Sequence, residues 1–209
     1  MKKEIYFSID IEADGPIPGI YSMLSLGCVA FNEEGKEIGD FSQNFFQLPD
    51  AITDEDTMRW WDSQPKAWEA CRKDMTAASL GMIKFAEWVK EFKGRPVAVC
   101  YPSGFDWPFV YYYLRAFAHE SPFGFQCLDM KTYASATLDT RFRDTVKRKM
   151  PKAWFDATLK HTHVAVEDAR EQGRMFFRMK RQNHRLHKRV ERFEAEQTNI
   201  GPIIMPHKP

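Results

Sequence analysis

The predicted fold starts from the stretch Ile5-Tyr-Phe-Ser-Ile-Asp-Ile-Glu12. Every second residue from Ile5 to Ile11 is apolar, which is the period of a β-strand. Side chains two positions apart share one face of a strand, so Asp10 and Glu12 lie together at its carboxyl end. Two neighbouring carboxylates repel each other and need cations or hydrogen bonds to remain ionised. The pair therefore indicates a divalent metal, and a solvent-exposed strand end is the alternative.

The elements around this strand predict an α/β fold with a mixed sheet. Strands over about 22–32 and 36–47 follow it through loops and a tight turn, which gives an antiparallel three-strand meander. Helices alternating with short strands come next, as in α/β domains with parallel strands. The predicted helices cover 54–61, 65–72, 76–92, 106–118, 130–138 and 164–195, and the later strands cover 97–100 and 125–128. In the helix over 76–92, the residues expected to face inward are Leu80, Ile83, Trp88 and Phe92.

Length and composition favour one ordinary globular domain. The chain has 209 residues, of which 44% are hydrophobic, enough for a single core over residues 1–195. Residues 196–209 contain three prolines and are expected to form a loose tail. The four cysteines include no C-x-x-C pair, which favours neither a zinc clip nor a disulfide framework and predicts a reduced, cytoplasmic location. The longest uncharged stretch, residues 15–32, is interrupted by Pro and Gly, so no membrane segment is expected.

The net charge of +1 conceals an uneven distribution of charged residues. Residues 1–80 hold 7 Lys/Arg and 15 Asp/Glu, a net charge of −8, whereas residues 81–209 hold 23 and 14, a net charge of +9. An acidic first part and a basic second part suggest metal ligands in one and attraction of a polyanion by the other.

Two further acidic residues and a histidine stand where chemistry is expected. Asp106 follows the apolar strand 97–100, at the edge where open α/β sheets place ligands; the alternative is a helix N-cap, because Pro108 comes soon after it. His163 precedes Asp168 by five residues, so the two side chains can meet only if His163 lies in the loop before the last helix. An inert surface histidine is the alternative, and His161 is the rival candidate.

In this order, Asp10-x-Glu12, Phe105-Asp106 and His163-x-Ala165-x-x-Asp168-Ala169 resemble the three motifs of the DEDDh branch of the DnaQ-like 3′–5′ exonucleases. The resemblance covers roughly residues 4–185 and implies an RNase H-like fold. Residues 57–64, with Trp60 and Trp61, look like the double-tryptophan segment of the branch that contains phage exodeoxyribonuclease A and the bacterial exoribonuclease AS type.

The resemblance implies a metal-dependent hydrolysis of phosphodiester bonds from a 3′ end, releasing nucleoside 5′-monophosphates. By this likeness Asp10, Glu12, Asp106 and Asp168 hold two divalent cations, Mg²⁺ or Mn²⁺, and His163 is the general base. The substrate is single-stranded RNA or DNA. Two departures affect contacts with the sugar and the terminal nucleotide: Pro102 replaces an Asn that many relatives have four residues before Asp106, and Ala13-Asp14 replaces a pair of threonines.

Substrate contacts are expected from a basic helix face and from aromatic residues near the motifs. In the last helix, seven basic residues recur every three or four positions from Arg170 to Arg192, which confines them to one face. They would attract phosphates, together with the basic segment (residues 141–152); an ordinary solvated face is the alternative. Unpaired bases could stack on aromatic rings. The predicted contacts are Ala13, Trp61, Phe105, Trp107, Arg178 and Arg181.

Two other functions compete with the exonuclease. A non-catalytic nucleic-acid-binding domain would keep the fold and use only the basic helix, but all four acids and His163 are present. A phosphatase of the haloacid dehalogenase class would need Asp at position 12 and a Thr or Ser soon after it, and Glu12-Ala-Asp14 provides neither. Leu186, Val190 and Phe193 form an apolar stripe far along the last helix, where a homodimer would form.

Overall fold

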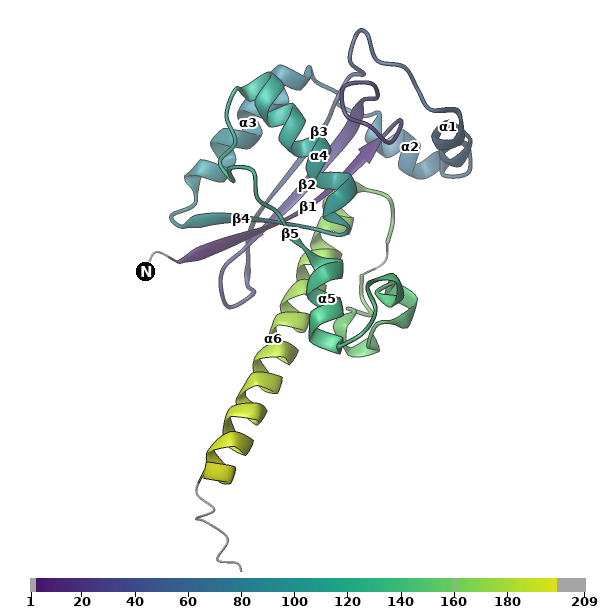
Figure 1. Cartoon of the computed structure of the whole chain (residues 1–209). Coiled ribbons are helices and arrows are strands. Elements are labelled where there is room, and N and C mark those ends of the chain that lie inside the picture. Colours follow the sequence, from purple (N-terminus) through teal and green to yellow (C-terminus); the bar gives the residue numbers. More distant parts are fainter. Residues whose placement is uncertain (1–2, 160, 199–209) are drawn as a thin grey trace, which may run out of the picture.

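The computed structural model describes residues 3–159 and 161–198, and its centre is a five-stranded sheet in the order β3-β2-β1-β4-β5 (Figure 1). The strands are β1 (Glu4–Ala13), β2 (Met23–Phe31), β3 (Glu37–Asn44), β4 (Arg95–Cys100) and β5 (Leu128–Asp129). β1 to β3 are antiparallel neighbours, whereas β4 pairs with β1 and with β5 in parallel. This sheet confirms the predicted meander followed by parallel strands, although β5 is only two residues long.

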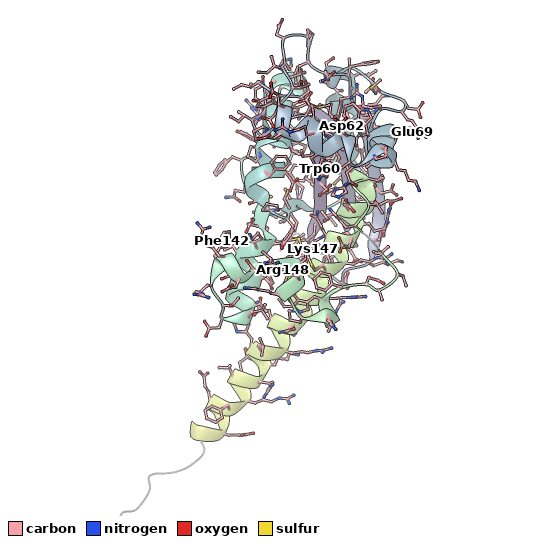
Figure 2. All side chains as sticks on the ribbon, turned by 90° about the vertical axis from the view of Figure 1, so that its right-hand side faces the viewer. Trp60, Asp62, Glu69, Phe142, Lys147 and Arg148 are labelled. Atoms are coloured by element: carbon pink, nitrogen blue, oxygen red, sulfur yellow. The ribbon has the colours of Figure 1, made fainter. Side chains whose placement is uncertain are left out.

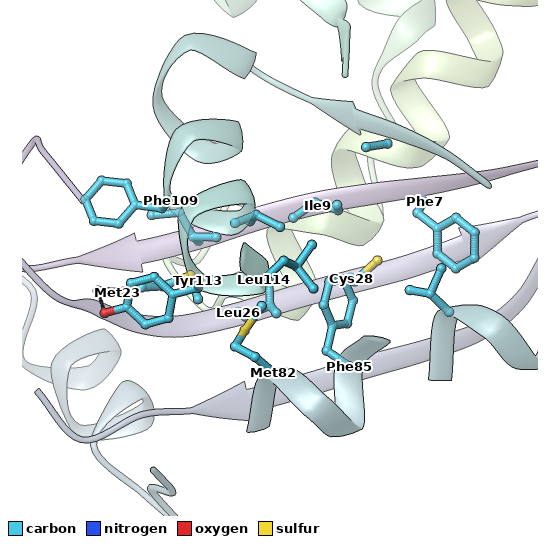
Figure 3. Close-up of a cluster of buried hydrophobic side chains, with 14 of the residues drawn as sticks. Phe7, Ile9, Met23, Leu26, Cys28, Met82, Phe85, Phe109, Tyr113 and Leu114 are labelled. Atoms are coloured by element: carbon cyan, nitrogen blue, oxygen red, sulfur yellow. Dashed lines mark hydrogen bonds between the residues drawn. The ribbon is translucent and has the colours of Figure 1, made fainter. Parts of the chain in front are cut away.

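Helices cover both faces of the two central strands. Apolar side chains of β1 such as Phe7 and Ile9 pack with α3 (Ala78–Glu91) and α4 (Ser103–Tyr113) (Figure 3). The other face of β1 meets the long helix α6 (Ala165–Thr198), where Tyr6 contacts Phe176 and Phe177. Asp10 and Glu12 lie on this second face, because strand side chains alternate. The polar set of the opening stretch is therefore buried under α6 and does not face solvent.

The predicted inward face of α3 needs a correction. Leu80 and Ile83 are 50% and 43% exposed, and the helix instead buries a stripe of Ala78, Met82, Phe85, Ala86 and Val89. These residues recur with helical periodicity and lie above the sheet, nearly opposite Leu80 and Ile83 on the helix at about 100° per residue. Trp88 and Phe92 flank the stripe and are partly buried against it.

The carboxyl edge of β1 is covered by two short helices, α1 (Glu55–Asp62) and α2 (Pro65–Cys71). Asp14 connects them to the sheet: its carboxylate accepts hydrogen bonds from the Ser22 backbone N and from Gln47 Nε2, and its carbonyl accepts one from Asp54 N. Asp54 then caps α1 by accepting from Thr57 N. The acidic residue that replaces a threonine at position 14 therefore has a structural role.

On the other side of the carboxyl edge lie α5 (Met130–Leu138) and three short 3₁₀ turns that begin in the basic segment: Phe142–Asp144, Lys147–Lys149 and Lys152–Trp154. Tyr101 Oη donates to the Thr145 carbonyl, and Trp154 Nε1 donates to Gln182 Oε1 of α6. Met150 and Trp154 are buried in the α6-side core. These contacts fix the path of the basic segment on the folded domain.

The helix α6 extends past the sheet and projects from the rest of the molecule (Figure 1). Its first turn approaches β2 so closely that a Cβ at Gly27 would lie 2.1 Å from the backbone of Ala165 and Val166. The helix includes residues 196–198 of the predicted tail, and residues 199–209 lie outside the described residues. In the described part of the chain, no helix is both long and apolar enough to cross a membrane.

Candidate functional site

Three of the predicted metal ligands meet between the end of β1 and the first turn of α6. Carboxylate oxygens of Asp10, Glu12 and Asp168 lie within 4.8 Å of one another. All three residues are buried, and Asp168 is fully inaccessible. Because α6 crosses the sheet at Gly27, Asp168 is held over the face of β1 that carries the other two acids. The spacing in the sequence therefore produces a compact cluster of hard oxygen ligands, the type that Mg²⁺ and Mn²⁺ prefer.

Asp106, the fourth predicted ligand, lies near this cluster on the first turn of α4, although its oxygens are not among those within 4.8 Å of one another. It is buried, its charge raises the pKa of Asp10, and it accepts a hydrogen bond from the backbone of Ile11. Among the described residues, its Oδ2 atom has no hydrogen-bond partner. The N-cap alternative is wrong, since the helix begins at Ser103 after Pro102 and Asp106 is its fourth residue. A buried carboxylate oxygen without a hydrogen-bond partner destabilises the folded protein unless a cation binds to it.

The electrostatics of the cluster also favour a cation. Burial and then mutual repulsion raise the pKa of Asp10 and of Glu12 well above the usual range, and burial does the same for Asp106. Burial also opposes ionisation of Asp168, but hydrogen bonds from His161 and from the backbone of Thr162 and His163 lower its pKa. One carboxylate is thus kept ionised by the protein, while the others need an additional positive charge.

Both histidines lie next to Asp168, in different ways. His161 Nδ1 is 3.1 Å from Asp168 Oδ2, and the His161 side chain is 45% exposed. His163 donates its backbone N–H to the same oxygen and has a φ of 57°, a left-handed conformation uncommon outside glycine. The His163 ring is half-buried between His161 and Trp60, with ring centroids 4.3 and 4.8 Å away. His163 thus lies in the loop before α6, as predicted.

Comparisons with known proteins agree with this site. Residues 6–179 match the Rv2179c-like family, described as a 3′-5′ exoribonuclease domain. The chain is also 32% identical over 188 residues to the Escherichia coli 3′-5′ DNA exonuclease Cap18, covering 83% of this chain and 90% of that protein. The chain belongs to the Rv2179c-like exonuclease family. It is a 3′–5′ exonuclease, and therefore a phosphodiester hydrolase.

Solved structures show the same fold at low sequence identity. The nuclease domain of 3′hExo, a DEDDh family member bound to rAMP, has a TM-score of 0.64 and 13% identity, over 86% of this chain and 92% of that one. E. coli exonuclease I in complex with a dT13 oligonucleotide also has a TM-score of 0.64 and 13% identity. It matches 91% of this chain, which spans only 43% of the exonuclease I chain. The RNase H-like fold of the DEDDh exonucleases is therefore confirmed.

In this Rv2179c-like exonuclease, three further polar residues lie at the site: Glu171 and Gln172, which were not predicted, and Lys147 of the basic segment, for which attraction of phosphate was predicted. Gln172 Nε2 donates to Asp10 Oδ1 over 2.6 Å, and Lys147 Nζ lies 2.5 Å from Glu171 Oε2. Glu171 and Gln172 stand three and four positions after Asp168, which places all three on one face of the helix. That spacing could have indicated both residues. The sequence does not show which basic residue of the segment reaches the site, because the position of Lys147 depends on tertiary contacts.

The predicted aromatic contacts are only partly found at the site. The assignment of Trp61 is wrong: its side chain is buried, and its Nε1 donates to the Ala13 carbonyl over 3.0 Å. Its neighbour Trp60 is 38% exposed and contacts His163. The two rings differ because the rotation of about 100° per residue on α1 turns one toward the core and one outward. Ala13 is itself buried at the bulge that ends β1, so its contribution at the site is limited to its backbone.

The two aromatic residues beside Asp106 have different environments. Phe105 is 38% exposed on the first turn of α4, so it stays a candidate for stacking. Trp107 packs edge-on against Phe123, and its Nε1 donates to the Phe125 carbonyl. Its indole thus stabilises the turn that leads into β5, and a substrate contact by Trp107 stays a prediction.

The basic face of α6 is less free than its sequence indicates. Arg170 pairs with Glu37 and Asp40 of β3, and Arg174 pairs with Glu37 and Asp156. Arg178, predicted to contact substrate, instead donates to the Phe155 carbonyl and to Asp156. These arginines hold α6 against its neighbours because acids from distant segments face them.

The basic residues of this face that form no ion pair in the described part of the chain lie further along α6. Arg181 and Arg185 form no ion pair within the residues the structure describes. With Arg178, they line a cavity of about 280 Å³ beside Trp154. The whole basic face was predicted to attract phosphates. Because its first arginines are paired with acids, that prediction now applies only to the later residues.

Proposed function

We propose that the protein degrades single-stranded RNA or DNA from the 3′ end and releases nucleoside 5′-monophosphates, using two divalent cations and His163 as the general base. The observation that carries this proposal is the meeting of Asp10, Glu12 and Asp168 within 4.8 Å, with Asp106 nearby, whose Oδ2 has no hydrogen-bond partner among the described residues. Membership of the family supports degradation in the 3′-to-5′ direction and hydrolysis of a phosphodiester bond.

The donor set fits Mg²⁺ or Mn²⁺. Asp10, Glu12, Asp106 and Asp168 would hold the ions, and buried carboxylates of raised pKa are the groups that gain most from a cation. When bound, two such ions stabilise both the attacking and the leaving oxygen of an in-line phosphoryl displacement. Gln172 orients Asp10 by donating to one of its oxygens, which leaves the other free to serve as a ligand.

His163 is the better candidate for the base. Its ring nitrogens have no hydrogen-bond partner among the described residues, whereas His161 already uses Nδ1 on Asp168. Burial and the charge of His161 lower the pKa of His163, so its imidazole is neutral at pH 7 and can accept a proton from the attacking water. Asp168 acts as a positioning group, because it fixes the backbone on which this ring is carried.

Features beside the acids suit an unpaired strand. Trp60 and Phe105 each present an exposed ring surface near the site, on which a base can stack. A cavity of about 490 Å³ lies between α2 and residues 162–164, next to the loop of His163. Arg181 and Arg185 would attract phosphates further along the strand. Nothing in this arrangement selects ribose over deoxyribose, so the proposal includes both.

The test is hydrolysis of 3′- and 5′-labelled single strands of RNA and DNA with Mn²⁺ or Mg²⁺, by wild type and by Asp10→Ala. We expect a ladder that shortens from the 3′ end, and no hydrolysis by the variant. Release of inorganic phosphate without shortening would indicate a phosphatase, and a mobility shift without cleavage would indicate a binding module. Full activity of Asp10→Ala would contradict the assignment of the site.

Oligomeric state and location belong to the same proposal. Leu186, Val190 and Phe193 are 38%, 53% and 62% exposed on the projecting part of α6, as the predicted homodimer requires. A monomer mass independent of concentration in sedimentation would exclude that dimer.

All four cysteines are free in the structure, and we propose a cytoplasmic location on that basis. Fractionation of cells tests this location.

A further inference from the structure

The strongest feature that the proposed mechanism does not use is an ion pair between Lys147 and Glu171 at the edge of the acid cluster. Lys147 Nζ lies 2.5 Å from Glu171 Oε2, and the two side chains are 28% and 9% exposed. A shielded pair of this kind usually stabilises a protein no better than two apolar side chains would. Its presence beside the catalytic acids therefore calls for a function other than stability.

Lys147 is positioned by the fold and not by its own flexibility. It begins a 3₁₀ turn that follows Thr145, and the Thr145 carbonyl accepts a hydrogen bond from Tyr101 Oη. The ammonium group lies 5.8 Å from the centre of the Tyr101 ring, a favourable distance for a cation over an aromatic face. Glu171 then holds the ammonium group from the α6 side. Three separate elements thus direct one cation toward the site.

Lys147 is held next to the acid cluster by its contact with α6. Its partner Glu171 stands three positions after Asp168 and next to Gln172, which donates to Asp10 Oδ1. Figure 2 shows Lys147 on the same face of the molecule as Trp60, the ring that contacts His163. Lys147 therefore lies on the face of the molecule where a 3′-terminal nucleotide would approach the acids.

An ammonium group has three N–H donors, and Glu171 accepts one of them. We propose that Lys147 donates a remaining N–H to a non-bridging oxygen of the phosphate on the 3′-terminal nucleotide, and that Glu171 is the positioning residue that holds it there. The ligand chemistry is a phosphate monoester or diester attached to a nucleoside. This inference rests on the proposed function, because it assumes that the acid cluster is where the terminal phosphate binds.

The experiment compares the binding of a nucleoside 5′-monophosphate, which is the expected product, with that of the same nucleoside without phosphate. Calorimetry with Ca²⁺ present gives the ratio of the two affinities for wild type, Lys147→Met, Lys147→Arg and Glu171→Gln. Loss of a charge-assisted hydrogen bond should reduce the ratio at least about tenfold in Lys147→Met. Lys147→Arg keeps the charge and should stay within about threefold of wild type, and Glu171→Gln should lie between the two.

The matched control is Lys90→Met, which removes another Lys–Glu ion pair. Lys90 is on the surface of α3, and its Nζ lies 2.7 Å from Glu120 Oε1. This variant should leave the ratio unchanged. A wild-type ratio in Lys147→Met would overturn the inference, as would an equal loss in the Arg and Met variants. A Ca²⁺ affinity that falls together with the ratio would overturn it too, because Lys147 would then act through the acids.

The failure of this inference and the failure of the proposed function give different results. If the wild type hydrolyses no labelled strand, the proposed function fails and the inference fails with it. If the wild type produces the 3′–5′ ladder while Lys147→Met binds the monophosphate normally, only the inference about Lys147 fails.

Discussion

Gly27 offers the sharpest test of how the fold positions the site. It lies on β2 where the first turn of α6 crosses the sheet, opposite Asp10 in the β1–β2 register. A Cβ added at this position would lie 2.1 Å from Ala165 C and from Val166 N, and 2.3 Å from Ala165 O. These are backbone atoms of a helix, so they cannot turn aside as a flexible side chain can. Gly27→Ala must therefore push the start of α6 away from β2.

The size of the movement follows from these distances. Ordinary van der Waals contact with a Cβ begins at 3.4 Å, so relief of the 2.1 Å approach requires a shift of about 1.3 Å. Asp168 lies three residues after Ala165 and would move with the helix. A misplacement of about 1 Å in a catalytic group can cost about 100-fold in rate, and overpacking of a core typically costs about 1–3 kcal/mol. We expect Gly27→Ala to lose about 100-fold in kcat and about 1–3 kcal/mol of unfolding free energy.

The assay is the initial rate of hydrolysis of a labelled single strand at saturating Mn²⁺, with urea unfolding of the same preparations. Gly104→Ala is the matched control, since a Cβ at Gly104 meets nothing within 4 Å. Gly104 is the second residue of α4 and lies two positions before another site acid, Asp106. Its replacement by Ala in a helix should leave the rate unchanged and stabilise the protein by about 0.5–1 kcal/mol. A wild-type rate and stability for Gly27→Ala would refute the claim that this close approach positions Asp168.

Three further predictions concern the base and the strand-binding surface. His163→Ala should lower kcat by about 10²–10⁴-fold, whereas His161→Ala should lower it less than about tenfold; initial rates that show the reverse would move the base to His161. Burial, His161 and Lys147 lower the pKa of His163, and a base works when deprotonated, so the acid limb of kcat/KM should lie below pH 6.5; a midpoint above that value would contradict this environment. Replacing both Arg181 and Arg185 by Gln should reduce the slope of log Kobs against log salt by about 1.4, or about 0.7 for each phosphate of a single strand that is no longer neutralised. An unchanged slope would remove this part of α6 from the binding surface.

Sequence periodicity predicted the elements well where a local pattern determines them. The alternation in residues 5–12, the turn at Gly35 and the apolar run before Cys100 led to strands that the sheet contains. The helix over 130–138 matches α5 in both bounds. Hydrophobic alternation alone did not show that β1 is buried on both faces, because its second face carries the polar residues of the site.

The side-chain positions that the sequence did not reveal depend on parts of the chain that are far apart in sequence. Arg178 appeared free because its acceptors, the Phe155 carbonyl and Asp156, come from a segment more than twenty residues earlier. Trp60 and Trp61 cannot be assigned to surface and core from a helix of eight residues until the direction of the sheet is known. Lys147 reaches Glu171 only because the basic segment is tied down at Thr145. Tertiary contacts thus decide which of several similar side chains serves the site.

The helix α6 explains why a chain of net charge +1 can act on a polyanion. Its first turns carry Asp168 and Gln172 onto the acidic face of β1, where cations would reverse the local charge. Its third turn is neutralised by pairs such as Arg174 with Asp156, and the turns near its middle present Arg181 and Arg185 without such partners in the described part of the chain. With cations at the acids, phosphate would be attracted both at the start of α6 and along its basic face, which suits a polyanionic strand whose 3′ end lies at the acids.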